Sequence, residues 1–270
     1  MNAKEHEEFG TLFAHLEDLW RRAEQGMLSH SAFLSPRELH YGEVYLNRMG
    51  AFYRSFGGYD EAERRRLYLL PPYMEEAVEA EAQDWEAALA SFGYGTDIAV
   101  LQIVGSGYRN LSHRDFLGSL LGLGLERSVL GDLLIDGEEG RRAVLFCEEG
   151  MVSFLETEWK KVANDKVTVL RLSKEAWHLP PRRFAPIGDT VASPRLDCVI
   201  AALCGLSREK ARETVCSGLV EMNFESEDRP DRPVLAPCLI SVRGYGRYRV
   251  VSLNDRTKKG RLRLTAERYL

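Results

Sequence analysis

The sequence is poor in cysteine and contains no long hydrophobic run. Its 270 residues include five cysteines, an odd number, and no two of them form a C-x-x-C pair. This argues against a disulfide framework and against a zinc site, and it is typical of a reducing cytoplasm. The longest apolar stretch, residues 117–125, is interrupted by three glycines and a serine, whereas a membrane helix needs roughly 18 apolar residues. Because the N-terminus also lacks an apolar signal core, we expect a cytoplasmic protein that spans no membrane and holds no metal.

Basic residues are scarce in the first two thirds of the chain and abundant at its end. The net charge is −5, but residues 1–192 contain 21 Lys/Arg against 31 Asp/Glu, whereas residues 193–270 contain 15 against 10. In the last 28 residues nine basic side chains stand against two acidic ones. A basic end on an acidic body indicates either nucleic-acid binding or a solvated tail that meets its own acidic neighbours, and charge alone does not separate the two.

The apolar spacing of the first 91 residues predicts a helical region. Large side chains recur at intervals of three and four residues, which places them on one helix face: Phe9, Leu12, Phe13, Leu16, Leu19 and Trp20. Ser35, Pro36 and Glu38 have the spacing of a helix start with a capping box. We expect residues 1–91 to form an α-helical N-terminal region.

A change of period marks a second region, residues 92–174. Strand-like runs alternate with helical patterns in the order 97–104, helix 112–121, 130–135, 143–147, helix 151–162 and 166–172. This β-α-β-β-α-β order predicts a ferredoxin-like domain, an arrangement that RNA-recognition modules also use. The third strand, which starts at Arg142, lacks the paired stacking aromatics of those modules. We therefore expect the fold to match that of an RNA-recognition module while the binding face does not.

A proline-rich segment separates this region from a third one. Residues 175–192 contain three prolines and an arginine pair, which predicts a stiff linker. Residues 193–270 then show two short helices, stopped by Gly205 and Gly218, followed by short strands. The sequence thus predicts an α+β protein with a helical N-terminal region, a ferredoxin-like middle domain and a small C-terminal domain.

The third region resembles the S4 RNA-binding domain. The residues that carry the resemblance are Arg195-Leu196-Asp197, Leu206-Ser207-Arg208, Ala211, Gly218-Leu219-Val220 and Asn223. In that family two helices lie across an RNA backbone, and the arginine after the serine is among the contacts. The chain departs from the family at Phe224, where glycine is frequent, and at Pro237-Cys238, where an acidic residue is frequent. The resemblance implies an S4 domain at residues 193–270.

Three further motifs resemble the bacterial YlmH family and cover nearly the whole chain in the right order. They are residues 57–64 (GGYDEAER), residues 113–118 (HRDFLG) with Gly131-Asp132, and the C-terminal residues 241–247 (SVRGYGR) and 257–261 (TKKGR). The resemblance implies a role on the large ribosomal subunit, since members are similar to a quality-control factor that holds peptidyl-tRNA while alanine tails are added. The implied partners are large-subunit rRNA, tRNA, the ribosome and a tail-adding quality-control factor, and we expect a monomer.

Basic and polar side chains of the C-terminal region are the candidate RNA contacts. Guanidinium groups pair with phosphate in a bidentate manner and stack on unpaired bases. With the S4 resemblance, this predicts the following contacts: Arg195, Ser207, Arg208, Lys210, Arg212, Asn223, Arg243, Arg247, Lys258, Lys259 and Arg261. As a general base, His113 would need a nucleophile or an orienting partner, and the sequence shows neither. We therefore predict that His113 and Arg114 form a secondary RNA contact rather than a catalytic site.

The sequence predicts a non-catalytic RNA-binding protein, and two alternatives stay open. One is an RNA-modifying enzyme that uses the S4 domain for delivery, and the other is a ribosome assembly factor that binds rRNA. The only R-L-D sequence, which a pseudouridine synthase would need in its active site, lies inside the S4 helix at residues 195–197. Residues 105–110 (GSGYRN) lie between a strand and a helix, as a nucleotide loop would, but they lack the third glycine and predict a plain turn. No cofactor is therefore expected.

Overall fold

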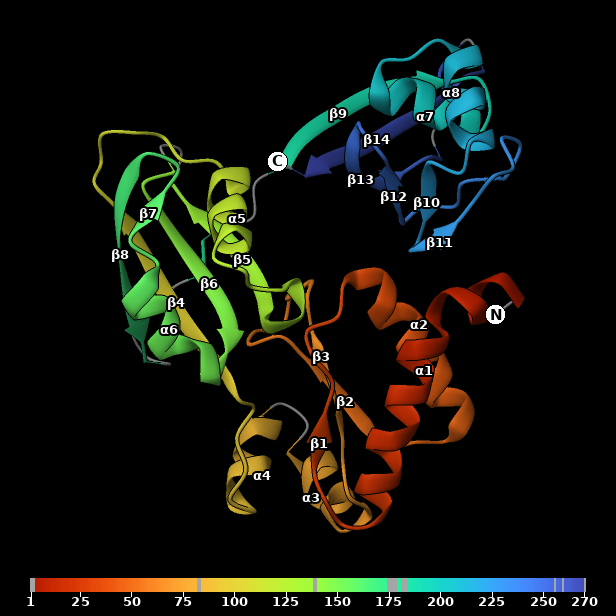
Figure 1. Ribbon diagram of the computed structural model, residues 1–270. Helices are drawn as coiled ribbons and strands as arrows, with labels where there is room; N and C mark the ends of the chain where they lie inside the picture. Colours follow the sequence, from red (N-terminus) through yellow and green to blue (C-terminus); the bar gives the residue numbers. More distant parts are fainter. Residues whose placement is uncertain are drawn as a thin grey trace. The chain divides into compact units, whose positions relative to one another are not determined.

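The computed structural model describes residues 3–81, 84–137, 140–173, 179–180, 184–254, 256–258 and 260–269. The chain divides into two compact units, Met1–Pro181 and Arg182–Leu270, and Figure 1 shows the elements of each. Both units combine helices with sheets whose paired strands run antiparallel. The prediction of an α+β protein is therefore confirmed.

The first unit begins with a region in which helices pack on a small sheet. The helices are α1 (Ala3–Glu24), α2 (Pro36–Met49), the 3-10 helix η1 (Pro72–Met74), α3 (Glu75–Ala80) and α4 (Trp85–Ser91). Strands β1 (Ser29–His30), β2 (Tyr53–Phe56) and β3 (Arg66–Leu69) form a sheet of order β1-β3-β2. α2 begins at the predicted capping box, since the Ser35 hydroxyl accepts from the Glu38 N–H at 3.3 Å and the Glu38 carboxylate accepts from the Ser35 N–H at 2.7 Å.

The prediction of a purely helical region at residues 1–91 is wrong, because it misses this three-stranded sheet. All four residues of β3 are buried, so the strand shows none of the apolar–polar alternation by which a half-buried strand is found. β1 and β2 are too short to show a clear period of their own. The helix periodicity itself held for α1, whose Phe9, Phe13, Leu16 and Leu19 are buried.

The middle part of the first unit contains one sheet with two helices on one of its faces. Its elements are β4 (Ile98–Gly105), α5 (His113–Gly122), η2 (Arg127–Val129), β5 (Leu130–Asp136), β6 (Arg142–Glu148), η3 (Glu149–Met151), α6 (Val152–Glu158), β7 (Lys161–Val162) and β8 (Asp165–Leu172). The strand order is β5-β6-β4-β8-β7. Phe116 and Leu120 of α5 and Leu155 of α6 share a core with Leu101 and Leu145 of the sheet, so both helices cover the same face.

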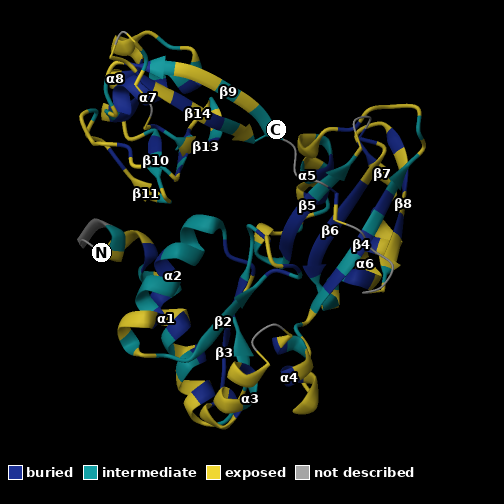
Figure 2. Cartoon of the chain, turned by 180° about the vertical axis from the view of Figure 1, so that it is seen from behind, coloured by how far each residue is buried: buried dark blue, intermediate teal, exposed yellow. Residues whose placement is uncertain are grey.

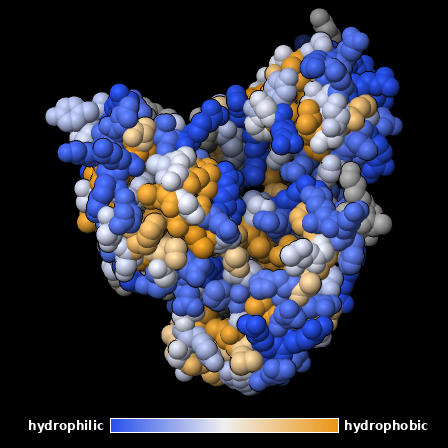
Figure 3. All heavy atoms as spheres, viewed as in Figure 1, coloured by the Kyte–Doolittle hydropathy of each residue, from blue (hydrophilic) through white to orange (hydrophobic). Residues whose placement is uncertain are grey.

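The surface of this part is uneven in polarity. Figure 2 shows the buried residues of β5 and β6 in dark blue; in β5, an edge strand, they are the first four residues. In Figure 3, hydrophobic residues on the visible face gather over α5 and the segment that follows it. Leu121 in that helix is 41% exposed.

The second unit is a six-stranded sheet with two short helices. The strands are β9 (Phe184–Val191), β10 (Val220–Met222), β11 (Glu225–Ser226), β12 (Cys238–Val242), β13 (Gly246–Ser252) and β14 (Leu262–Tyr269), in the order β11-β10-β12-β13-β14-β9. The helices are α7 (Leu196–Cys204) and α8 (Arg208–Cys216). Their inward side chains, among them Leu196, Ile200, Ala211 and Val215, share one core with the sheet.

The boundary of the C-terminal part differs from the prediction. The linker predicted at residues 175–192 is wrong for residues 184–191, which form β9 and pair along their whole length with β14; residues 174–178 and 181–183 lie outside the described residues. Pro186 concealed the strand, but β9 is an edge strand, where proline is tolerated. β14 itself was also missed, because its buried Leu262, Leu264 and Ala266 alternate with charged and polar residues inside the basic tail.

Candidate nucleic-acid interface

A buried carboxylate at the start of α7 holds two of the predicted contact residues. Asp197 accepts hydrogen bonds from Nε and Nη2 of Arg195, each at 3.1 Å. The Nε atom of Arg208, at the start of α8, lies 3.5 Å from Oδ2 of the same carboxylate. Only 3% of the Asp197 side chain is exposed, whereas 40% of Arg195 and 63% of Arg208 are exposed. The two guanidinium groups are therefore fixed on their inner side and open to solvent on their outer side.

The charge of Asp197 is secured by its hydrogen bonds. Burial by itself would raise its pKa, but the side-chain hydrogen bonds from Arg195 and Cys198, together with the charges of Arg195 and Arg208, outweigh burial and hold the pKa below its ordinary value. The two oxygens of an ionised carboxylate can accept about four hydrogen bonds, so one carboxylate can bind two guanidinium groups at once. Asp197 thus positions the two arginines at neutral pH.

A second buried carboxylate repeats this arrangement on the loop that precedes β12. Glu227 accepts bonds from Nε and Nη2 of Arg229 at 2.9 and 3.0 Å, and Nε of Arg232 lies 3.4 Å from it. The Glu227 side chain is 10% exposed, whereas those of Arg229 and Arg232 are 60% and 46% exposed. The side-chain bond from Arg229 is the main cause that lowers the pKa of Glu227.

Backbone hydrogen bonds join the two carboxylate sites. The N–H groups of Leu196 and Asp197 donate to the carbonyls of Arg232 and Pro230, at 2.9 and 3.0 Å, and the N–H of Val234 donates to the carbonyl of Pro194 at 2.7 Å. The loop therefore lies against the first turn of α7. We call Arg195, Arg208, Arg229 and Arg232 the four-arginine cluster: four exposed guanidinium groups held by two buried carboxylates.

Sequence reasoning found half of this cluster. Arg195 and Arg208 were predicted from the S4 resemblance, but Arg229 and Arg232 were not among the predicted contacts. The signal that was available is the spacing of Glu227, Arg229 and Arg232, with Pro230 inside this segment and Pro233 directly after it to stiffen the loop. Sequence spacing alone does not show that this loop returns to α7, since that depends on the long-range backbone bonds.

α8 presents its predicted residues on its outer side. The Ser207 hydroxyl caps the helix by accepting from the Lys210 N–H at 3.2 Å. Lys210 itself pairs with Glu213 at 2.9 Å, so part of its charge is used within the helix. Arg212 is exposed and lies four residues after Arg208, on the same side of the helix.

Asn223 has a structural task in the hairpin between β10 and β11. Its side-chain oxygen accepts from the Leu239 N–H at 2.9 Å, and its own N–H donates to the Leu239 carbonyl at 2.8 Å. Asn223 and Phe224 both have positive φ angles, 51° and 70°, a conformation that asparagine tolerates better than most residues. The side-chain carbonyl of Asn223 is therefore already engaged within the protein.

The remaining predicted contacts divide between the two ends of the sheet. Val191 pairs with Leu262, so Arg261 and Lys258 lie at the sheet end from which the chain continues to Arg195. Arg261 donates to the hydroxyl of Thr190 at 2.9 Å. Lys258 is exposed, and Lys259 lies outside the described residues.

Arg243 and Arg247 lie at the other end of the sheet, where a turn joins β12 and β13. Arg243 is exposed, and the guanidinium of Arg247 lies 5.8 Å from the ring centre of Tyr269. The eleven predicted contacts therefore do not form one continuous site: Arg195, Arg208, Lys258 and Arg261 share a sheet end, and Arg243 and Arg247 do not belong to it.

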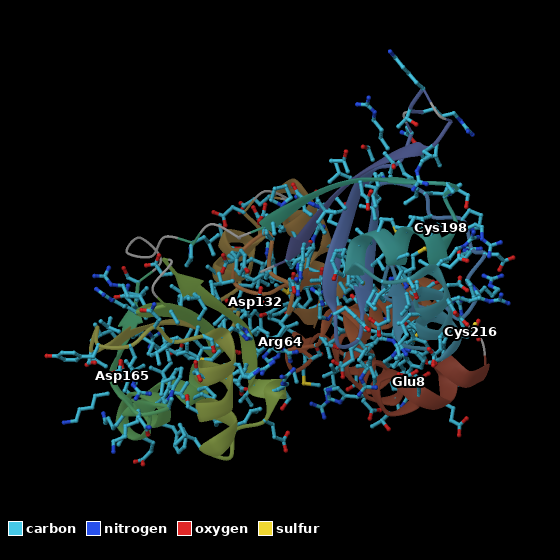
Figure 4. All side chains as sticks on the ribbon, turned by 90° about the horizontal axis from the view of Figure 1, so that it is seen from above. Glu8, Arg64, Asp132, Asp165, Cys198 and Cys216 are labelled. Carbon is cyan, nitrogen blue, oxygen red and sulfur yellow. The ribbon has the colours of Figure 1, made fainter. Side chains whose placement is uncertain are left out.

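In the first unit, two of the sequence motifs meet at a polar junction. Asp132 accepts from the Tyr59 hydroxyl at 2.6 Å and from the backbone N–H groups of Glu63 and Arg64 at 2.8 and 2.9 Å. The Arg64 guanidinium donates to the carbonyls of Leu130, Phe33 and Arg127, between 2.8 and 3.0 Å. Figure 4 shows Arg64 and Asp132 next to each other. The GGYDEAER segment and Gly131-Asp132 thus fasten the N-terminal region to the middle sheet.

His113 and Arg114 lie in the first turn of α5, after the capping residue Ser112. Desolvation and the nearby Arg127 lower the pKa of His113. His113 is therefore neutral near pH 7 and offers a hydrogen bond rather than a charge to a phosphate group. Arg114 is exposed and carries the charge of this turn.

The described part of the chain contains no helix long and apolar enough to cross a membrane. Within the same residues, no three His, Cys, Asp or Glu side chains are grouped as a metal site would require.

Comparison with known proteins places these features in a family context. Residues 87–176 match the family model described as "Putative RNA-binding domain in YlmH", a range that contains the whole middle sheet with α5 and α6. The resemblance to the YlmH family is confirmed. The chain is also 28% identical, over 251 residues, to the "Ribosome-associated protein quality control protein P2" of Bacillus subtilis (strain 168). The aligned region covers 92% of this chain and 91% of that relative.

A solved YlmH structure is also similar to this chain. It is the "Cell division protein ylmH from Streptococcus pneumoniae", which is 19% identical, with a TM-score of 0.49, and the similarity covers 64% of this chain and 94% of that one.

Proposed function

We propose that this chain is a non-catalytic RNA-binding protein that binds rRNA and tRNA on the large ribosomal subunit, in quality control of stalled peptidyl-tRNA. The four-arginine cluster carries the proposal. Each of its guanidinium groups uses one side for a buried carboxylate and directs its remaining donors to solvent, where a phosphate group can accept them. The four guanidinium groups outnumber the two carboxylates that hold them, and Asp228 and Asp231 of the same loop are close enough to act on Arg195 and Arg229.

The proposed architecture has three parts. We infer a helical N-terminal region that includes the β1-β3-β2 sheet, a ferredoxin-like middle domain at residues 92–174 and a C-terminal S4 domain that starts with β9 rather than at residue 193. The strand order β5-β6-β4-β8, in which the first and third strands of the region are central, supports the middle assignment. The adjoining N-termini of α7 and α8, joined through Asp197, support the S4 assignment.

The proposed partners are large-subunit rRNA, tRNA and a tail-adding quality-control factor, with the chain acting as a monomer. The name of the Bacillus subtilis relative links that protein to quality control on the ribosome, and its similarity over most of both chains supports the same role here. The YlmH domain model supports RNA as the ligand of the middle part.

The geometry favours a binding protein over an RNA-modifying enzyme. The aspartate of the only R-L-D sequence is Asp197, whose carboxylate is buried and occupied by two arginines. Glu227 is occupied in the same way. Neither carboxylate of the cluster is therefore available as a nucleophile or a general base.

Co-sedimentation with ribosomal particles tests this proposal. The full-length chain is centrifuged through sucrose gradients with large subunits that carry peptidyl-tRNA, with empty large subunits and with assembly precursors. We expect preferential binding to the subunits with peptidyl-tRNA and no change in the mass of their RNA. Preferential binding to precursors would favour an assembly factor, and a mass change in the RNA would favour an enzyme.

Variants connect this binding to the cluster. The double variant Arg208→Ala/Arg229→Ala should lose most of the co-sedimentation, whereas Arg22→Ala, which removes an exposed arginine from α1, should bind like the wild type. Equal binding of the double variant and the wild type would contradict the assignment of the site.

A further inference from the structure

The outer face of the middle sheet is covered at one end by the N-terminal region. Phe146 and Val144 of β6 pack against Tyr59 and Ala62, and the rings of Tyr59 and Phe146 lie 4.9 Å apart. Phe146 is fully buried. RNA-recognition modules stack bases on aromatic side chains of this sheet face. In this chain Phe146, the aromatic side chain of the central strands, therefore packs inside the protein and cannot stack on a base.

The other end of the same face is open. Val104 pairs with Arg142 on one side and with Thr168 on the other, so these three side chains form one row across the sheet. Lys166 lies two residues before Thr168 on the same face. Arg142, Lys166 and Thr168 are exposed, whereas the neighbouring Ile103 and Ala143 point to the helices and are buried. This end of the face therefore carries two exposed cations, and Asp136 of β5 lies beside Arg142 in the same row.

A tyrosine on the loop after β4 lies at this open end. Tyr108 is 93% exposed, the highest value among the large hydrophobic side chains in the described residues. Its loop is fixed at the base, because Asp165, which is 5% exposed, accepts bonds from the N–H and the hydroxyl of Ser106. Figure 4 shows Asp165 well away from Arg64 and Asp132, the junction with the N-terminal region. The next residue, Arg109, is also exposed.

We propose that Tyr108, Arg109, Arg142 and Lys166 form a second RNA-binding surface, which takes an unpaired stretch of RNA. A base would stack on the Tyr108 ring, and the three cations would donate hydrogen bonds to the flanking phosphates. Base stacking on exposed aromatics beside a positive groove is how proteins bind single strands without sequence preference. The inference rests on the proposed function, since it assumes that RNA is the ligand. In RNA-recognition modules the bases stack on the middle of the sheet, a position that is covered here. The proposed site lies instead at the end of the sheet, on the loop that carries Tyr108.

The test compares two RNA probes on the full-length chain by fluorescence anisotropy: a short unstructured oligo(A) and an RNA hairpin. Tyr108→Ala should weaken binding of oligo(A) by about 5- to 150-fold, as the loss of one stacked base implies. Tyr108→Trp should retain the affinity, because it keeps a stacking ring. Tyr73→Ala removes another exposed tyrosine of the same unit, 54% exposed, and should leave binding unchanged.

The outcomes separate this inference from the proposed function. If the wild type binds neither probe, the proposed function fails. If the wild type binds both probes and Tyr108→Ala binds oligo(A) equally well, the second surface is overturned while the proposed function stands. If a photocrosslinker at position 108 on ribosomes reacts with protein and not with RNA, the surface binds a protein partner and the inference is likewise overturned. Because Tyr108 is almost fully exposed, none of its variants should alter folding.

Discussion

Asp197 accepts two hydrogen bonds from Arg195 at 3.1 Å, although only 3% of the Asp197 side chain is exposed. This pair links the folding of the C-terminal unit to its surface chemistry. The carboxylate lies in the interior, where an unpaired charge is costly, and the guanidinium lies at the surface, where it is open to solvent. The same relationship between Glu227 and Arg229 extends the cationic surface to a loop far away in the sequence.

The first prediction concerns Asp197. Asp197→Asn removes the charge that two arginines share while the amide keeps nearly the same shape. We expect the free energy of unfolding of the C-terminal unit to fall by about 1–3 kcal/mol, because hydrogen bonds to a charged group are lost in a buried position. Urea unfolding followed by circular dichroism measures the change. Glu213→Gln, which breaks the exposed pair with Lys210, is the control and should have no measurable effect.

The pKa values of Asp197 and Glu227 predict a pH dependence. Both are lowered in the folded protein, so each group binds its proton less readily when folded than when unfolded. Their stabilisation is therefore complete above the unfolded values, about 3.9 and 4.3, and is lost as the pH falls through the lower folded values. Urea unfolding between about pH 6 and pH 3 should show this loss in the wild type. The double variant Asp197→Asn/Glu227→Gln should have a flatter profile, and parallel profiles would contradict the assignment.

Gly58 is predicted to be indispensable for the junction in the first unit. A Cβ atom there would lie 2.4 Å from the Phe146 ring, and its φ of 100° is unfavourable for any other residue. Gly58→Ala should therefore destabilise the first unit by about 2–4 kcal/mol through overpacking and backbone strain. Thermal unfolding measures the effect. Gly95→Ala is the matched control, since no atom lies within 4 Å of its added Cβ.

The boundary of the C-terminal unit gives a prediction about fragments. Val191 of β9 is 3% exposed and belongs to the same core as Leu264 of β14. A fragment of residues 182–270 should unfold cooperatively, whereas a fragment of residues 193–270 lacks β9 and exposes the edge of β14. We expect a lower melting temperature for the shorter fragment. Equal melting temperatures would mean that β9 adds nothing to the stability of this unit.

Local signals in the sequence were sufficient to predict several elements. The capping boxes at Ser35 and Ser112 are both present in the structure, because a cap depends only on residues three positions apart. The apolar face of α1 was found for the same reason. In contrast, β3 and β14 were missed, since a fully buried strand has no alternation and a strand in a basic tail has its alternation masked by charge.

Only those residues of the candidate site that belong to a local sequence pattern could be predicted. Arg195 and Arg208 were found because they accompany the two S4-type helices. Arg229 and Arg232 were missed, because their place beside α7 depends on hydrogen bonds between residues more than 30 positions apart. The motif GGYDEAER was recognised by resemblance, but its role at Asp132 follows from a contact 73 residues away between Tyr59 and that carboxylate.

The most direct test of the central claim is the salt dependence of RNA binding by the full-length chain and by Arg208→Ala/Arg229→Ala. Each phosphate contact contributes about −0.7 to −0.9 to the slope of log K against log salt, so four to six contacts give a wild-type slope of roughly −3 to −5. If both arginines bind phosphate, the double variant should have a slope shallower by about 1.4 to 1.8, and Arg22→Ala should match the wild type. A double variant with the wild-type slope and affinity would contradict the claim that the four-arginine cluster is the RNA-binding site.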